Sequence, residues 1–106
     1  MTNTGLHADT NVSRRTLGEA LLLSISERGH TNHDAALLMG TARANVHQWT
    51  MDLIDPLPEN YDTLMEYLGA DLDTLGSLII HSQIRRAELR NERTRTGPNA
   101  YPIGVQ

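Results

Sequence analysis

Cysteine is absent from the 106 residues, and so is lysine. Without cysteine the chain forms no disulfide and carries out no thiol chemistry, which is compatible with a reducing cytoplasm. Without lysine, all fixed positive charge is carried by nine arginines, whose guanidinium groups suit bidentate contacts to phosphate or guanine. The codon bias of a GC-rich genome would explain the same preference for arginine.

Long apolar runs are also missing. No run approaches the roughly 20 residues that a membrane span needs, and no charged start leads into the apolar core of a signal peptide. We therefore expect a soluble, cytoplasmic protein with one domain and one modest core. No glycine-rich phosphate loop, no pair of carboxylates in a shared apolar pocket and no recognisable arrangement of Ser, His and Asp occurs. We expect neither an enzyme nor a bound cofactor.

The net charge of −4 is unevenly distributed. Residues 52–73 carry seven acids and no arginine, whereas residues 85–95 carry five arginines and two glutamates. The negative sum speaks against a protein coated in phosphate-binding groups. The distribution of charge along the chain matters more than the net charge, because a protein with a negative net charge can still have a locally basic face.

The most informative stretch is TNHDAALLMGTARANVHQWT, residues 31–50. Thr31 is a good N-cap with Asp34 three residues later, which predicts a helix over residues 32–39 with an acid in its first turn. Gly40 then ends that helix, because glycine adopts the left-handed conformation at least cost. A tight turn at this glycine leads into a second helix.

The second helix is predicted over residues 42–50 and crosses the first at a steep angle. The methyl side chain of Ala36 lets the two backbones approach, while Val46 and Trp49, three residues apart, turn inward as a buried pair. The outward face carries hydrogen-bonding residues of short or medium length and one alanine, a face that can enter a DNA major groove. Its members are Arg43, Ala44, Asn45, His47 and Gln48.

On these positions the chain resembles the helix-turn-helix family of phage repressor, Cro and Xre-type regulators. The resemblance covers roughly residues 16–75, and the family's small, glycine, aliphatic and tryptophan positions are occupied by Ala36, Gly40, Val46 and Trp49. It implies an all-α, lambda-repressor-like bundle of about five helices. It further implies a transcriptional regulator, typically a repressor, that binds double-stranded operator DNA, an inverted repeat, as a homodimer.

The resemblance also implies roles for single residues. In the family the residue matching Asn32 bonds a phosphate, and those matching Arg43, Ala44 and Gln48 meet bases. Arg43 can donate to guanine O6 and N7, Gln48 can pair with adenine, and Ala44 can touch a thymine methyl. The expected DNA-binding residues are Asn32, Thr41, Arg43, Ala44, Asn45, His47 and Gln48.

Two departures from the family pattern bear on function. The family usually has Ser or Thr at the position of Ala42 as N-cap, so one hypothesis is that Thr41 caps the second helix, which then begins one residue earlier. The loop after this helix carries Asp52 and Asp55, where the family has a cation or a neutral residue beside the DNA backbone. Two carboxylates near phosphates should weaken binding.

Helices are predicted on either side of this pair. Ser13 or Thr16 starts one that runs to Arg28 and is ended by Gly29; its buried stripe is Leu17, Ala20, Leu21 and Ile25. Another follows two prolines and covers residues 59–68; its apolar face is Tyr61, Leu64, Met65 and Leu68. His30 stands where the family usually has an aliphatic residue. His30 and His33 flank a helix start with no further ligand nearby, so we expect no metal site.

Asp71 is predicted to cap a last helix over residues 72–93. One face of it, which should pack on the bundle, is formed by Leu72, Leu75, Leu78 and Ile79. A second apolar stripe, about 100° around the helix, is formed by Ile80, Ile84 and Ala87. This stripe is either a dimer seam or a face buried against the first helix.

The predicted organisation is a flexible N-terminal arm over residues 1–12, a DNA-binding domain with an extended last helix over residues 13–93, and a disordered tail over residues 94–106. The alternative function is an antitoxin-like or adaptor module with little DNA binding. Such a module would use the same bundle to bind a basic protein partner through its acidic residues 52–73. Salt-dependent binding to duplex DNA separates the two functions.

Overall fold

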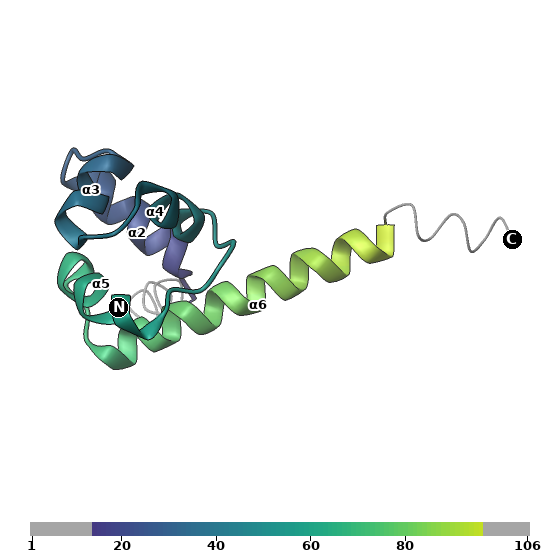
Figure 1. The fold of residues 1–106 in the computed structure, drawn as a ribbon. Helices are drawn as coiled ribbons and strands as arrows, with labels where there is room; N and C mark the ends of the chain where they lie inside the picture. Colours follow the sequence, from purple (N-terminus) through teal and green to yellow (C-terminus); the bar gives the residue numbers. More distant parts are fainter. Residues whose placement is uncertain (1–13, 97–106) are drawn as a thin grey trace, which may run out of the picture.

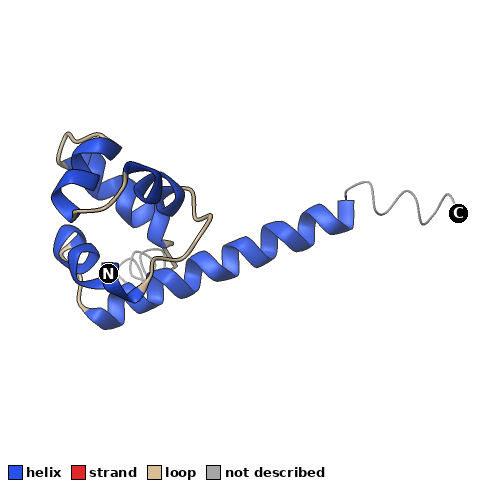
Figure 2. Ribbon diagram, viewed as in Figure 1, coloured by secondary structure: helices blue, strands red, loops and turns tan. Residues whose placement is uncertain are grey.

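Four short helices and a 3-10 turn gather beside the first half of a 25-residue helix, α6, in the computed structural model (Figure 1). The structure describes residues 14–96, with side chains up to residue 92. Its elements are α2 (Leu17–Glu27), α3 (Asn32–Met39), α4 (Arg43–Thr50), η1 (Pro58–Asn60), α5 (Tyr61–Leu68) and α6 (Leu72–Thr96). Figure 2 shows no strand within this range. The prediction of an all-α bundle of five helices with a long last helix is confirmed.

The helix bounds differ from the prediction by one residue at the end of α2 and the start of α4, and by more at two other places. The α-helix predicted from residue 59 begins at Tyr61, because the proline-led segment Pro58–Asn60 forms a tighter 3-10 turn first. Helix α6 continues to Thr96, three residues past its predicted end, so residues 94–96 of the expected tail are helical. The rest of that tail and the expected arm over residues 1–12 lie outside the described residues. No helix within residues 14–96 combines the length and apolarity that a membrane crossing requires.

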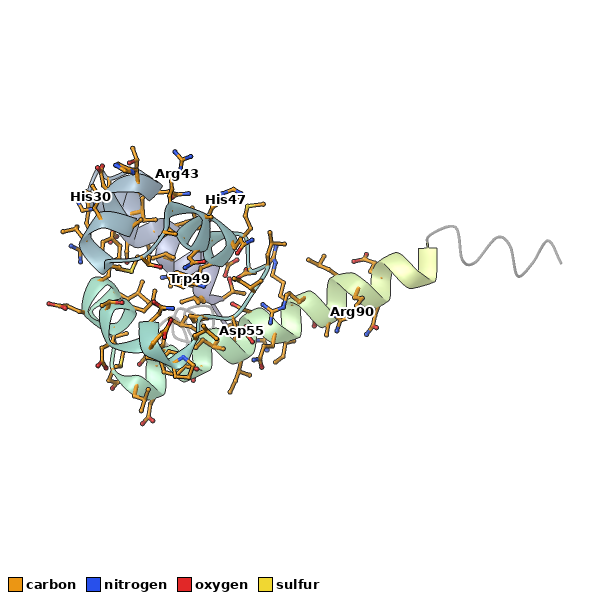
Figure 3. All side chains as sticks on the ribbon, in the orientation of Figure 1. His30, Arg43, His47, Trp49, Asp55 and Arg90 are labelled. Carbon is orange, nitrogen blue, oxygen red and sulfur yellow. The ribbon has the colours of Figure 1, made fainter. Side chains whose placement is uncertain are left out.

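One apolar core joins all the helices. Trp49 is 2% exposed and lies in the interior of the bundle (Figure 3), while Ala36 and Val46 are fully enclosed beside it. The other buried apolar residues are Leu17, Leu21, Ile25, Ala35, Met39, Leu64, Tyr67, Leu75, Leu78 and Ile79. The predicted inward pair of α4 and the small residue at its crossing with α3 are therefore confirmed.

The apolar faces of the last two helices needed correction. Leu72 was placed on the packed face of α6 but is 59% exposed as the first residue of that helix, whereas Leu75, one turn later, is fully buried. Tyr67, outside the predicted face of α5, is buried. Ile80 and Ile84 remain 53% and 48% exposed, so burial of the second α6 stripe against α2 does not occur within one chain.

Four helices end in the same backbone motif. One residue after α3 and α5, and two residues after α2, stands a glycine with a positive φ: Gly40, Gly69 and Gly29, at 66°, 69° and 68°. The next amide in each case donates to the carbonyl five residues back, as in the bond from Thr41 to Ala36. At the end of α4 the equivalent residue is Asp52, with φ 57°, and Leu53 donates to Gln48. Asp52 is the only described residue other than glycine with a positive φ.

The carboxylate of Asp52 explains this exception. It is buried and accepts three hydrogen bonds of 2.8 Å, from the amide of Gly18 and the hydroxyls of Thr16 and Ser82. Ser82 also accepts from the amide of Leu17 at 2.9 Å. The start of α2, the end of α4 and the middle of α6 meet at this one side chain, whose negative charge also suits the N-terminus of α2. The expectation that Asp52 lies exposed beside DNA phosphates is wrong.

Asp55 is also engaged within the fold. Arg86 on α6 donates to Asp55 Oδ1 at 2.7 Å and to the backbone carbonyl of Asp52 at 3.0 Å. Gln83 donates to Asp55 Oδ2 at 2.7 Å. These bonds fasten the loop between α4 and α5 to α6. They also offset the charge of the second carboxylate that was expected to repel DNA.

Gly18 provides a test of this junction. A Cβ atom on Gly18 would lie 2.6 Å from the Thr50 carbonyl oxygen and 2.7 Å from Asp52 Oδ1. Gly18→Ala should therefore lower the free energy of unfolding by about 2–4 kcal/mol, because backbone as well as side chain must shift. Chemical denaturation followed by circular dichroism measures it.

The matched control is Gly76→Ala in the interior of α6, where an added Cβ meets nothing within 4 Å. Alanine should be neutral there or stabilise by up to about 1 kcal/mol through its higher helix propensity. Equal stability of the Gly18→Ala and natural proteins would contradict the close approach at Gly18.

Candidate nucleic-acid interface

The pair α3 and α4 is built by local signals in the sequence. Thr31 and Asp34 form a reciprocal capping box at the start of α3, with bonds of 3.0 and 3.1 Å between each side chain and the other residue's amide. The turn after α3 depends on Gly40 at φ 66°. Without a Cβ at this position, the chain reverses and leads directly into α4.

Helix α4 begins without a side-chain cap. Ala42, in extended conformation at φ −75° and ψ 146°, is the N-cap residue and its methyl group accepts no hydrogen bond. The hypothesis that Thr41 caps α4 is wrong. Because Ala42 is itself the last residue before the helix, Thr41 lies one position too early; its hydroxyl instead accepts a 2.9 Å bond from the Asn45 side-chain amide.

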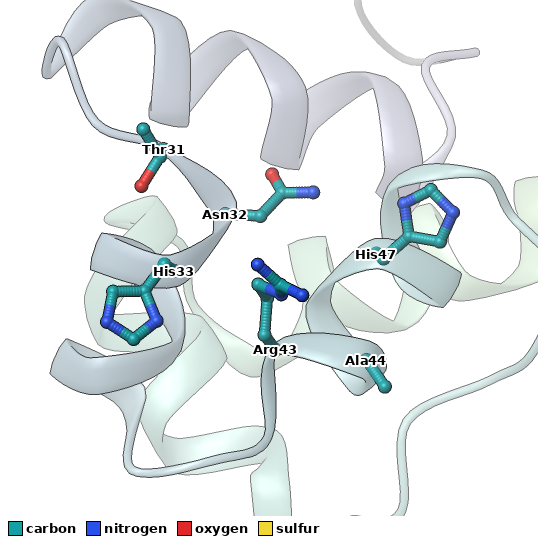
Figure 4. Close-up of a pocket in the computed structure, with 6 residues that line it drawn as sticks. All are labelled: Thr31, Asn32, His33, Arg43, Ala44 and His47. Carbon is teal, nitrogen blue, oxygen red and sulfur yellow. The ribbon is translucent and has the colours of Figure 1, made fainter.

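Six residues from the two helices line one open hollow of about 740 Å3 (Figure 4). Thr31, Asn32 and His33 come from the start of α3, and Arg43, Ala44 and His47 from α4. Four of the seven residues expected to bind DNA are thus brought together: Asn32, Arg43, Ala44 and His47. The hollow lies where the first turns of α3 and α4 face each other.

Positive and neutral groups form this hollow, and no carboxylate lines it. Arg43 and His47 point away from the bundle (Figure 3), and the Arg43 guanidinium forms no ion pair within the described part of the chain. Figure 4 shows Arg43 between His33 on one side and His47 on the other, with Asn32 facing it. An anion in the hollow could accept hydrogen bonds from several side chains, and no carboxylate of the lining would repel it.

Asp34 lies in the first turn of α3, one residue after His33. The pKa of Asp34 lies below its ordinary value, mainly because the Thr31 amide donates to the carboxylate; the Thr31 hydroxyl and the charges of His30 and His33 lower it further, against the effect of partial burial. The carboxylate is therefore ionised at neutral pH, with its acceptor capacity directed to its own helix start.

Three expected contact residues do not line the hollow. Thr41 and Asn45 are hydrogen-bonded to each other, so Asn45 is half-buried with its amide occupied. Gln48 is also half-buried and lies further along α4. Thr31 and His33 were missed as site residues, since the sequence indicated Thr31 only as a cap and His33 only as part of a metal pair. Both residues are neighbours of Asn32 at a helix start, and this position could have indicated that they belong to the same site.

His30 has a structural role. Its Nδ1 lies 2.9 Å from the Tyr67 hydroxyl, in a cluster where the Arg28 guanidinium lies 4.2 Å over the Tyr67 ring and donates to the Tyr67 carbonyl at 2.6 Å. Burial raises the pKa of Tyr67, with Arg28 opposing and Asp34 adding to the shift. The cluster joins the end of α2 to α5, so the polar ring of His30 has a bonding partner within the fold. Across residues 14–92, no three His, Asp or Glu side chains gather as a metal site would require.

Comparisons of the chain with models of protein families, with curated proteins and with solved structures found no match.

Proposed function

We propose that this chain is a cytoplasmic, sequence-specific DNA-binding regulator that inserts α4 into the major groove of an operator as a dimer. The observation that carries the proposal is the grouping of Asn32, Arg43, Ala44 and His47 on one open hollow without a carboxylate. An α-helix fits the major groove of B-form DNA, where side chains at its N-terminal end reach base edges. Arg43 and Ala44 occupy the first two positions of α4.

Each side chain of the hollow suits one part of a DNA duplex. The Arg43 guanidinium matches O6 and N7 of guanine, and the methyl group of Ala44 matches that of thymine. Asn32 at the start of α3 is placed to donate to a phosphate, which fixes the register of the helix rather than the sequence it reads. Gln48 lies further along α4, so it would reach an adenine only at the edge of the contact between α4 and the DNA.

The arrangement of charges supports the same proposal. The two acids that should have weakened binding are engaged elsewhere, Asp52 inside the fold and Asp55 with Arg86. The exposed acids of residues 52–73 lie on η1, α5 and the start of α6: Glu59, Asp62, Glu66, Asp71 and Asp73. A DNA backbone approaching α4 therefore meets Arg43 and two imidazoles before any carboxylate of that group.

The dimer would form through α6. This helix projects well beyond the other helices (Figure 1), and an isolated helical extension is only marginally stable in water. Ile80, Ile84, Ala87 and Asn91 follow spacings of four, three and four residues, the seam pattern of a two-stranded coiled coil. An asparagine in such a seam commonly sets the register and the number of strands.

The function test is selection from random duplexes followed by titration of the selected site at several salt concentrations. A regulator should select a site and bind it with a log K that falls linearly with log salt, because phosphate contacts release counterions. The alternative is the adaptor module, whose acidic patch is now reduced to the five exposed carboxylates. Absence of binding to any duplex would reject the regulator in favour of that module.

Arg43 should read a base. Arg43→Ala should cost about 1–3 kcal/mol of binding free energy on the selected site and relax the preference at one base pair. Asn32→Ala is the matched comparison, because loss of a phosphate contact should weaken all sequences nearly equally. Titrations against the site and its single-base variants measure both. If Arg43→Ala weakens every variant by the same factor, Arg43 contacts only phosphate.

Ile84 should lie in the dimer seam. Ile84→Glu should convert the dimer to a monomer in analytical ultracentrifugation while helicity is retained, since the side chain is already 48% exposed within one chain. Leu89→Glu is the control, because Leu89 is equally exposed, at 49%, but faces a different side of α6. Dissociation by Leu89→Glu and not by Ile84→Glu would move the seam to the other face.

A further inference from the structure

The four histidines in the described part of the chain fall into two pairs with different surroundings. His30 bonds Tyr67, and the Nδ1 of His81 lies 3.1 Å from the backbone carbonyl oxygen of Arg15. His33 and His47 are exposed and form no hydrogen bond within residues 14–92. These two imidazoles line the same hollow, one from each helix, on either side of Arg43 (Figure 4).

We propose that His33 and His47 take up protons when the hollow holds a DNA phosphate, so that affinity for the operator rises as the pH falls. This inference rests on the proposed function and adds to it a regulation by pH and a further binding residue, His33. The ligand is an anion, because the Arg43 guanidinium between the imidazoles disfavours a metal cation.

The chemistry of imidazole and of a phosphodiester supports this coupling between protonation and binding. Imidazole changes its charge between about pH 5 and 8, the range in which a phosphodiester keeps its single negative charge. A neutral imidazole offers one N–H donor, whereas the protonated ring offers two donors and a full charge. A phosphate bound beside the ring therefore favours the protonated form, and by linkage the protonated form binds the phosphate more tightly.

Two other charged groups lie near the rings, Arg43 within the hollow and Asp34 in the first turn of α3. A bound phosphate would carry the charge opposite to that of Arg43 and of a protonated imidazole. Asp34 is bonded to Thr31 at the start of α3, and His30 is bonded to Tyr67. The charged groups on the packed helices bond or lie elsewhere: Glu19 pairs with Arg85, and Arg28 lies over Tyr67. Glu27 and Glu66 line other hollows, with Asp71 and with Met39 respectively.

The test is a titration of the selected duplex at constant ionic strength at pH 6, 7 and 8. The natural protein should bind about tenfold or more tightly at pH 6 than at pH 8, as expected for added charge at phosphate contacts. His33→Gln and His47→Gln should each reduce this dependence, and the double variant should remove it. His81→Gln, distant from the hollow, is the control and should keep the full dependence.

Calorimetry in two buffers of different ionisation enthalpy counts the protons directly. The natural protein should take up protons on binding the duplex near pH 7, and the double variant should take up none. Circular dichroism checks that the variants stay folded, as expected for two exposed side chains.

An unchanged pH dependence in the double variant would overturn this inference and leave the proposed function intact. Failure of the natural protein to bind any duplex at any of the three pH values would overturn both.

Discussion

The fold depends on one buried carboxylate. Asp52 accepts hydrogen bonds from Thr16, Gly18 and Ser82, residues 36, 34 and 30 positions away, and so joins α2, α4 and α6 at a single point. A buried charge of this kind is stable only when its hydrogen bonds are complete, and removal of one partner leaves donors unpaired in the interior. Its backbone takes the left-handed conformation that glycine supplies at the ends of α2, α3 and α5. At the end of α4 this position is occupied by Asp52, whose side chain forms three hydrogen bonds, and not by glycine, which would adopt the same φ with less strain.

This junction matters for the candidate interface because it holds α4 at its C-terminal end. The other end is positioned by the turn at Gly40 and by close packing against Ala36. With both ends fixed, the outward groups of α4 are presented by a rigid element, which precise recognition of a groove requires. The same bonds remove Asp52 and, through Arg86, the charge of Asp55 from the surface that would face DNA.

Short-range signals in the sequence predicted the α3 and α4 pair well. The cap at Thr31, the glycine at position 40 and the spacing of Val46 and Trp49 each act within a few residues, and the structure agrees with all of them. The Asp52 junction was missed because its partners are more than 29 positions distant. Two signals were present: Gly18 inside a helix, which often marks a close approach, and Ser82 on an apolar stripe. The hollow was only partly predicted, because helix periodicity gives the direction of His33, Asn45 and Gln48 but not which of them bond within the fold.

The most direct test of the junction is the free energy of unfolding of Asp52→Gly. Glycine adopts the φ of 57° without strain, so a variant that depended only on backbone conformation would be at least as stable as the natural protein. Loss of the carboxylate leaves the Thr16 hydroxyl and the Gly18 amide without their partner, and leaves the Ser82 hydroxyl only its 3.2 Å bond to the Leu78 carbonyl. The predicted result is a loss of about 2–4 kcal/mol, in the range for unpaired donors that stay buried. Unchanged or increased stability would contradict the central role of this side chain.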